Sequence, residues 1–371
     1  MTAEHFVAAE RIVAYLLMLS VLVVLHEYGH FLVARRSGVR VTDFAVGMGP
    51  TLAKWTSPRS GTNYRLNVLP IGGYCQMKGE DGKSEAEQQR EFRSAAEHDP
   101  DNFQAKTPLT RLAIVLAGPV ANFIVAIVLL FGAALVFGTP GEIPTTTVYQ
   151  LVPGFPAAKA GMQSGDRIVA IDGVAMRNGA QLVQTIHGSL GHHLRVTYEH
   201  NGATASADLT PVGMPGDMKD GHLGFQPLPS TQRVNAGEAW QYTTHEFAFV
   251  WTATFGALGG LITHPATVAG QVQGPIGMAR ASMTAQQFGP FYFIAIAAMI
   301  SISLGIFNLL PIPALDGGRG AFIVVEMLRG KPVDPEKEAL VHVGGIAVLI
   351  VLMLVISFRD VASALTGGAA F

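Results

Sequence analysis

The sequence predicts a polytopic α-helical membrane protein with about four transmembrane helices, a membrane-associated β-hairpin and one small extramembrane α+β domain. Two observations support this class. Only 14% of the 371 residues are charged, whereas globular proteins typically carry about 25%. Four apolar runs, at residues 12–33, 112–137, 291–312 and 341–358, also approach or exceed the roughly 17–25 residues that a helix needs to cross a bilayer.

The charge balance and the cysteine content narrow the functional classes. The 25 basic and 27 acidic residues leave a net charge of −2, which gives no support to a nucleic-acid partner. The single cysteine, Cys75, excludes an internal disulfide framework. Its apolar neighbours are typical of a small core residue rather than of a catalytic thiol.

The first apolar run is interpreted as a retained helix rather than a signal peptide. Arg11 is the only basic residue before it, and no small-residue cleavage site follows it. The remaining runs then divide the chain into consecutive segments. These are the first transmembrane helix (1–34), a cytoplasmic segment with the hairpin (35–111), the second transmembrane helix (112–138), the extramembrane domain (145–230), an interfacial helix and linker (235–290), the third transmembrane segment (291–320) and the fourth transmembrane helix (339–360).

Basic residues near the ends of the runs predict the orientation, because lysine and arginine favour the cytoplasmic side. They follow the first run, precede the second and follow the third, whereas none stands between the second run and Lys159. We therefore expect residues 34–111 and 319–338 in the cytoplasm, and residues 138–290 and both termini outside. The basic residues concerned are Arg35, Arg36, Arg40, Lys106, Arg111, Arg319, Arg329, Lys331 and Lys337.

Residues 247–262 form a further apolar stretch that leaves two interpretations open. The stretch has about 16 residues, is rich in glycine and is bracketed by His245, Glu246 and His264. A helix lying in the membrane interface fits these features better than a fifth span.

The cytoplasmic segment contains strand-like residues 63–79, with a break from Pro70 to Gly73 and an apolar middle. We expect a hairpin that dips into the membrane face, which is tolerable there only if protein or a wet cavity covers its backbone. The polar residues 80–108 are expected to form a flexible or amphipathic loop.

The extramembrane region 145–230 has the pattern of a small folded domain. It reads as a strand, a short helix ending at Gly161, a second strand, a longer helix and a hairpin with Asn201-Gly202 at its tip. The stretch AGMQSGDRIVAIDG at residues 160–173 resembles the signature of PDZ domains, and we find one such copy.

The pentapeptide HEYGH at residues 26–30 carries charge into an apolar run. His26 and His30 are four residues apart, so they share one helical face at a spacing suited to one zinc ion. Glu27 is placed to act as general base, activating a zinc-bound water, as in the HExxH constellation of zinc peptidases. A chance HExxH on a packed helix is the alternative. A charged residue within a span costs roughly 2.5–3.5 kcal/mol, however, and usually has a function.

A catalytic zinc site usually has three protein ligands, and Asp316 is the best candidate for the third. His26 lies seven residues before the cytoplasmic end of the first run, or about 10 Å. Asp316 stands near the same end of the third run, where Pro311 and Pro313 can break the helix and turn the chain inward. A fifth crossing would put Asp316 at the opposite leaflet. The alternative interpretation is a turn aspartate in a DGG sequence.

Five motifs in order resemble the site-two intramembrane metalloproteases, most closely the PDZ-containing bacterial regulator of sigma-E branch. They are LHEYGHFLVARRSGV, NVLPIGGYCQMKGE, AGPVANFIVA, QGPIGMAR and NLLPIPALDGGR. The resemblance implies one Zn²⁺ held by His26, His30 and Asp316, with Glu27 as catalytic base. It also matches Asn308 to an asparagine implicated in substrate handling, and Pro311 and Pro313 to helix-breaking prolines. Cys75 stands where the family often has valine.

The substrate of such an enzyme is a helix, whose peptide bonds are hidden until it unwinds. Strand character and resemblance together suggest that the hairpin offers an edge, at Ile71, Gly72, Gly73 and Tyr74, to which an unwound substrate adds as a strand. Asn122, a polar group within the second run, is interpreted as a helix-packing residue. His342 is interpreted as an interfacial residue at the start of the last span.

The sequence thus predicts an intramembrane zinc endopeptidase of the bacterial inner membrane, with its active site near the cytoplasmic side and the PDZ-like domain in the periplasm. The resemblance implies single-span membrane substrates, such as a pre-trimmed anti-sigma factor or remnant signal peptides, besides the lipid bilayer itself. A membrane-anchored PDZ scaffold would not need intact His26, Glu27, His30 and Asp316. A zinc transporter would place its metal-binding residues along a path rather than at one depth.

Overall fold

A computed structural model describes residues 3–79, 99–214, 217–264, 274–331, 333 and 335–365. The chain forms two compact units. The first, which we call the helical unit, comprises Met1–Gly132, Thr243–Met283 and Phe293–Phe358. The second, the β-rich unit, comprises Ala133–Tyr242, Thr284–Tyr292 and Arg359–Phe371. Most of the predicted loop 80–108 lies outside the described residues.

Among the described residues, four helices contain stretches long and apolar enough to cross a membrane, as the sequence predicts. The stretches are Ala9–Arg36 in α1 (Ala3–Arg36), Pro108–Phe137, which is the whole of α3, Pro290–Leu309, which is the whole of α9, and Leu340–Val361 in α11 (Pro335–Leu365). The chain is therefore a multi-pass membrane protein. The third apolar run extends to residue 312, but α9 ends at Leu309, because the prolines that follow cannot continue the helix.

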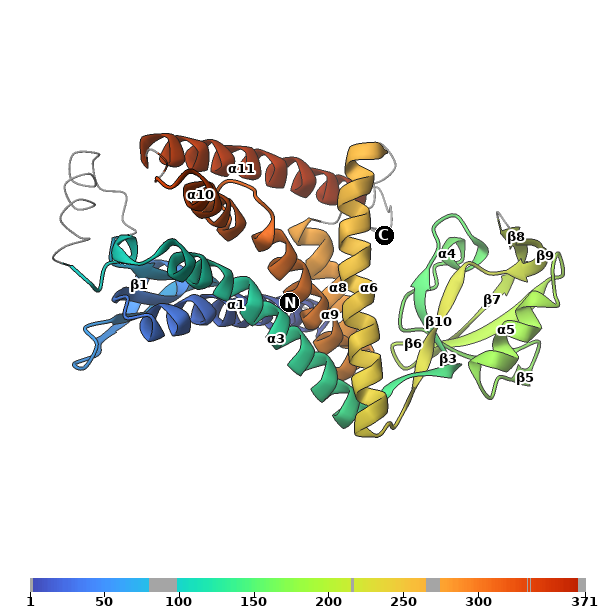
Figure 1. Cartoon of the computed structure of the whole chain (residues 1–371). Coiled ribbons are helices and arrows are strands. Elements are labelled where there is room, and N and C mark those ends of the chain that lie inside the picture. The colour runs from blue at the N-terminus through green and yellow to red at the C-terminus, as the bar shows by residue number, and fades with distance from the viewer. Residues whose placement is uncertain are drawn as a thin grey trace. The chain divides into compact units, whose positions relative to one another are not determined.

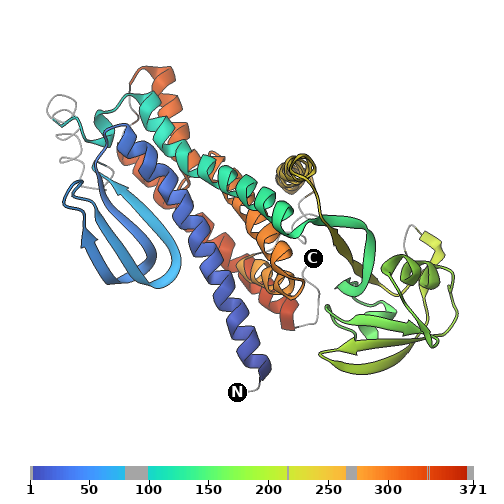
Figure 2. The same ribbon diagram turned by 90° about the horizontal axis from the view of Figure 1, so that it is seen from below.

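Helices α1 and α3 run side by side (Figure 1; Figure 2) because small residues let their backbones approach. A Cβ atom on Gly29 of α1 would overlap the carbonyl oxygen of Ala117 on α3. Further along α1, the buried side chains of Tyr15, Met18 and Leu22 pack against Ala297 of α9. These contacts hold three of the four apolar helices together around the HEYGH segment.

The segment predicted to be cytoplasmic contains a two-stranded sheet of β1 (Val41–Thr56) and β2 (Asn63–Met77). The structure differs here from the expected hairpin within residues 63–79: β2 bends at Gly72, whose φ is +79°, but its main partner is β1. Residues 41–46 pair with residues 73–77 on one side and with residues 63–66 on the other. The segment 73–77 is consequently an outer strand of this small sheet.

The sheet is fixed to the helices by one buried cluster. Phe44, Cys75 and Met77 of the sheet pack against Phe31 and other apolar residues of α1, α3 and α10 (Asp316–Arg329). The side chain of Cys75 is buried in this cluster, as expected of a core residue. The opposite end of the sheet exposes large apolar side chains, namely Met48, Leu52, Trp55, Leu66, Val68 and Leu69.

Three further elements lie wholly or mostly in the helical unit. A 3₁₀ turn, η1 (Phe103–Ala105), precedes α3, and α6 (Ala236–Thr263) and α8 (Pro275–Gln287) precede α9. The apolar stretch 247–262 forms part of α6, which is not among the four helices that could cross a membrane. On one side of α6, the rings of Phe247 and Trp251 pack against Phe123 of α3.

The β-rich unit has the elements that the sequence predicts for the extramembrane domain. Its main sheet has the order β10-β3-β4-β6-β7, with β5 paired to β4, and β8 and β9 form a separate pair. The strands are β3 (Thr139–Leu151), β4 (Arg167–Ile171), β5 (Val174–Ala175), β6 (Leu194–His200), β7 (Ala203–Leu209), β8 (Val212–Met214), β9 (Asp217–His222) and β10 (Phe225–Gln232); the helices are α4 (Pro156–Lys159) and α5 (Gly179–His187).

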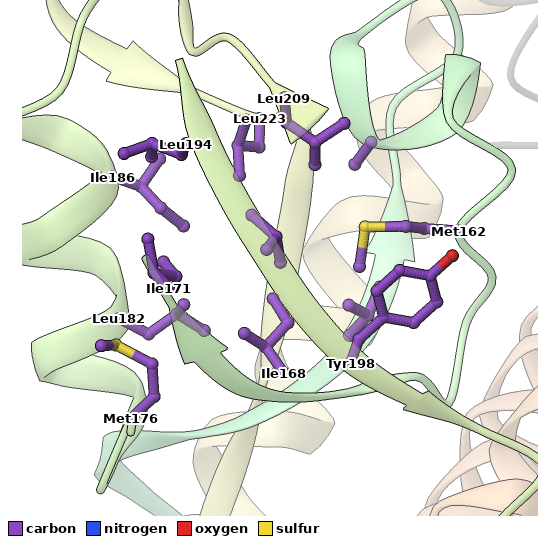
Figure 3. Packing of buried hydrophobic residues seen from close by; sticks show 13 residues of the cluster. Met162, Ile168, Ile171, Met176, Leu182, Ile186, Leu194, Tyr198, Leu209 and Leu223 are labelled. Carbon is purple, nitrogen blue, oxygen red and sulfur yellow. The ribbon is translucent and has the colours of Figure 1, made fainter. Parts of the chain in front are cut away.

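Apolar side chains on one face of this sheet make the core of the β-rich unit. Figure 3 shows Leu182 and Ile186 of α5 packed with Ile168 and Ile171 of β4 in one cluster. The β6–β7 hairpin turns at Asn201 and Gly202, whose φ values are +49° and +82°. Positive φ at both turn residues suits the Asn-Gly sequence that predicts this hairpin.

Candidate metal centre

Helix α1 places two histidines at one point. His26 and His30 are four residues apart, and both side chains are buried, with only 6% and 7% of each residue exposed. Their Nε2 atoms lie 3.2 Å apart. Two ring nitrogens from one helical face therefore converge inside the helical unit, as the spacing predicts.

The aspartate that joins them comes from a break in the helices. After α9 ends at Leu309, the chain runs through a short non-helical segment until α10 begins at Asp316. The two glycines after Asp316 make this break compact, since a Cβ on Gly317 would overlap the carbonyl oxygen of Leu310. Asp316 Oδ2 then lies 3.0 Å from His26 Nε2 and 3.2 Å from His30 Nε2.

These three atoms fit a divalent metal ion such as zinc. They all lie within 4.8 Å of one another, the one such group of histidine, cysteine or acidic residues among the described residues. Ligands about 2.0–2.1 Å from a tetrahedral zinc are about 3.3 Å apart, close to the observed separations. His30 Nδ1 donates to the Ile114 carbonyl oxygen at 2.8 Å, which leaves the lone pair of a neutral ring on Nε2. Asp316 Oδ2 is buried, and the donor set is typical of catalytic zinc.

Glu27 lies next to this cluster and against the sheet. Its carboxylate accepts a hydrogen bond from the backbone of Cys75 in β2. Its Cγ atom lies close to Gly73, where an added Cβ would stand 3.7 Å away. The structure thus brings the predicted base and the predicted strand edge together beside the converging ligand atoms.

Helix α3 forms the wall behind the two histidines. A Cβ atom on Gly118 would overlap Nε2 of His30 and Cε1 of His26. Asn122, one helical turn further on, is fully buried, and its Nδ2 lies 3.0 Å from Nδ1 of His26. This contact corrects the interpretation of Asn122 as a packing residue. The sequence around Gly118 gave no signal that this residue leaves space for the two imidazoles.

The remaining predicted residues lie around the break between α9 and α10 and along β2. Asn308 donates its side-chain amide to the Leu304 carbonyl of its own helix at 3.0 Å. Pro311 and Pro313 lie in the non-helical segment, and Tyr74 pairs with Ala45 of β1. His342 of α11, predicted only to be interfacial, contacts the same break through Ala314.

Two histidines and an aspartate that converge among apolar helices, with a glutamate beside them, define the class of membrane-embedded metal-site proteins. Within this class, the model of peptidase family M50 matches residues 14–352. The chain belongs to peptidase family M50, the site-two proteases, and it is a zinc metalloprotease. The resemblance that the five motifs carry is thereby confirmed.

Curated relatives match almost the whole chain. The zinc metalloprotease RasP of Geobacillus kaustophilus is 30% identical over 95% of this chain and 98% of its own length. A putative zinc metalloprotease of Agrobacterium fabrum is 32% identical over 95% and 96%. The regulator of sigma-W protease RasP of Bacillus subtilis is 29% identical over 94% and 98%. A solved PDZ domain of an SdrC-like protein from Listeria monocytogenes is 22% identical, with a TM-score of 0.21, over 24% of this chain and 93% of that one.

Proposed function

We propose that this protein is an intramembrane zinc endopeptidase that cleaves transmembrane segments near the cytoplasmic face of the bacterial inner membrane. The observation that carries the proposal is the convergence of His26 and His30, in an apolar helix, with Asp316 from the break between α9 and α10, next to Glu27. The positions of these side chains in the spans make peptide bonds within a membrane the natural substrate class.

His26 Nε2, His30 Nε2 and Asp316 Oδ2 are the proposed ligands of one zinc ion. Zinc, when bound, lowers the pKa of water towards neutrality and polarises a carbonyl group. Glu27 is the proposed general base: its carboxylate accepts a proton from the attacking water and passes one to the nitrogen of the departing amine. The hydrogen bond from the Cys75 backbone holds that carboxylate beside the site.

The outer segment of β2 is the proposed docking edge for the unwound substrate. A helix hides its peptide groups in its own hydrogen bonds, so it must lose them before cleavage. An extended chain that adds along Gly72, Gly73 and Tyr74 regains backbone hydrogen bonds from the edge. The closeness of Gly73 to Glu27 supports this placement, because a strand docked there lies near the base. Ile71, Asn308, Pro311 and Pro313 are proposed to shape the same substrate path.

The β-rich unit is proposed to act as a PDZ-like filter on the periplasmic side. Its support is the signature at residues 160–173 and the fold of one sheet packed on α5. Single-span proteins whose outer domain has been trimmed, such as an anti-sigma factor, and remnant signal peptides are the proposed substrates. The exposed apolar side chains at the end of the β1–β2 sheet support its contact with the membrane face.

Co-expression with a candidate single-span substrate tests the proposal. Glu27→Gln is expected to keep zinc and to lose about 10²–10⁴-fold in cleavage, and Asp316→Asn and His26→Ala are expected to lose zinc as well. Glu10→Gln, on an exposed position of the same helix, is the matched control and should cleave normally. Unchanged processing by Glu27→Gln, or full zinc content in His26→Ala, would overturn the proposal.

A further inference from the structure

One polar group of the helical unit has a contact that helix packing does not explain. Asn122 lies on α3 between apolar neighbours and is 0% exposed. Its Nδ2 atom stands 3.0 Å from Nδ1 of His26, whereas its Oδ1 atom is buried without a hydrogen-bond partner. A buried amide oxygen without a partner costs about 1–3 kcal/mol, and a second state of His26, with its proton on Nδ1, would use this oxygen.

The proton on His26 identifies that second state. A neutral imidazole has one N–H and one lone pair. In the arrangement seen here, the Asn122 amide donates to the Nδ1 lone pair, so the proton is on Nε2 and faces Asp316 Oδ2, 3.0 Å away. For Nε2 to ligate a metal ion instead, its lone pair must be free and the proton must move to Nδ1. A half-turn of the amide about its Cβ–Cγ bond then brings Oδ1 to Nδ1 as the acceptor.

We infer that Asn122 is a positioning residue for metal binding, whose amide turns so that Oδ1 accepts the Nδ1–H of His26 when Nε2 takes the metal. This inference rests on the proposed ligation by His26, His30 and Asp316. The amide can pair with Nδ1 of His26 in both states, through Nδ2 in the one and through Oδ1 in the other.

The second histidine has an equivalent partner on the same helix. His30 Nδ1 donates to the carbonyl oxygen of Ile114, and this bond sets the ring angle and the tautomer of His30. Helix α3 therefore orients both rings, one through its backbone and one through a side chain. Ser301 of α9 donates to the main-chain carbonyl oxygen of Asn122 at 2.8 Å, which fixes α3 against α9 at this level. Such partners of ligating histidines commonly change metal affinity 10–100-fold when they are replaced.

Zinc affinity of the purified full-length protein, measured by competition with a chelating dye, tests the inference without relying on catalysis. Asn122→Leu keeps the branching at Cγ but cannot pair with Nδ1, and we expect its zinc affinity to fall 10–100-fold. Asn122→Asp offers an acceptor only and should retain at least the wild-type affinity. Ser301→Ala, which removes the neighbouring hydrogen bond but leaves the amide, is the control and should change affinity less than threefold.

Three outcomes would count against the idea. Zinc affinity of Asn122→Leu within threefold of wild type would overturn it. If that variant does not fold, a folded Asn122→Asp protein with more than tenfold weaker zinc binding would do the same. Wild-type protein that binds no zinc through His26, as judged against His26→Ala, would instead overturn the proposed function on which the inference rests.

Discussion

His342 of α11 accepts a hydrogen bond from the backbone N–H of Ala314, with 2.8 Å between the ring Nδ1 and the amide nitrogen. Ala314 has a φ of +77°, in the left-handed region that residues with a Cβ seldom adopt. It stands two residues before Asp316, in the break between α9 and α10. The last apolar helix thus holds the segment that delivers the third proposed ligand.

Replacing His342 by leucine is expected to weaken zinc binding and cleavage by about three- to tenfold. The reason is the loss of one partly buried hydrogen bond, worth about 1 kcal/mol, at the segment that positions Asp316. Ala314→Gly is the informative comparison, because glycine adopts positive φ without strain and keeps the same N–H. We expect Ala314→Gly to match or exceed wild-type thermal stability. Equal zinc affinity in wild type and His342→Leu would contradict this role.

Gly118→Ala is expected to abolish zinc binding while α3 stays helical. The added Cβ would overlap both imidazoles at the ligand atoms, and the helix backbone behind Gly118 cannot retreat as a flexible side chain could. Zinc content and circular dichroism of the purified protein measure the two effects separately.

The same helix provides the control for this substitution. Apart from its own stretch of helix, no atom of the described residues lies within 4 Å of a Cβ placed on Gly132, so Gly132→Ala should keep zinc. It should leave the free energy of unfolding unchanged or raise it by about 0.5–1 kcal/mol, since alanine is the better helix former. Zinc binding by Gly118→Ala at the wild-type level would show that the two histidines do not need the space at residue 118.

Tyr74→Pro is expected to stop cleavage of a single-span substrate while zinc stays bound. Proline removes a backbone N–H from the outer segment of β2, where the substrate is proposed to add as a strand. We expect a loss of more than tenfold in cleavage, measured beside zinc content. Ile71→Pro, at the bend of the same strand, should behave alike.

Leu52→Pro serves as the matched proline control, because Leu52 lies at the exposed end of β1, where the described register gives it no partner. It should cleave within about threefold of wild type, as surface positions away from special contacts change little. Normal cleavage by Tyr74→Pro would exclude strand addition at this edge, and a loss of zinc in that variant would indicate a role in folding instead.

The apolar helices and the zinc-type pattern could be predicted from the sequence because both are local properties. Hydropathy is summed along one run, and His26 and His30 are related by the helical repeat alone. Asp316 could also be predicted as a ligand. The number of residues between a side chain and the end of its span gives its depth in the membrane, and Asp316 and His26 have similar depths.

The features that sequence reasoning missed depend on partners far along the chain. Strand β1 contains Gly47, Gly49 and Pro50, residues that disfavour strands, and it is paired by contacts with β2 on both of its sides. Asn122 and Gly118 carry no signal in their own neighbourhood, because their roles come from the two histidines on α1. Such contacts emerge only when the helices are packed.

Arg111 and Glu326 form a buried ion pair between the first turn of α3 and the last turn of α10, and it should respond to substitution as a pair. Only 7% of the arginine side chain and 14% of the glutamate side chain are exposed, and Arg111 also donates to Gln104 at 3.1 Å. Removing one charge leaves the other buried without compensation, which typically lowers the free energy of unfolding by about 3–5 kcal/mol.

We therefore expect Glu326→Gln to be strongly destabilising. The double variant Arg111→Met, Glu326→Gln should regain most of the lost free energy of unfolding. Denaturant unfolding of the detergent-solubilised protein measures both. A double variant no more stable than Glu326→Gln alone would show that the two charges do not act together. Because α10 begins at Asp316, the single variant should also bind zinc more weakly, since it loosens the far end of the helix that carries this ligand. Restored zinc affinity in the double variant would trace that effect to the uncompensated charge rather than to the lost contact.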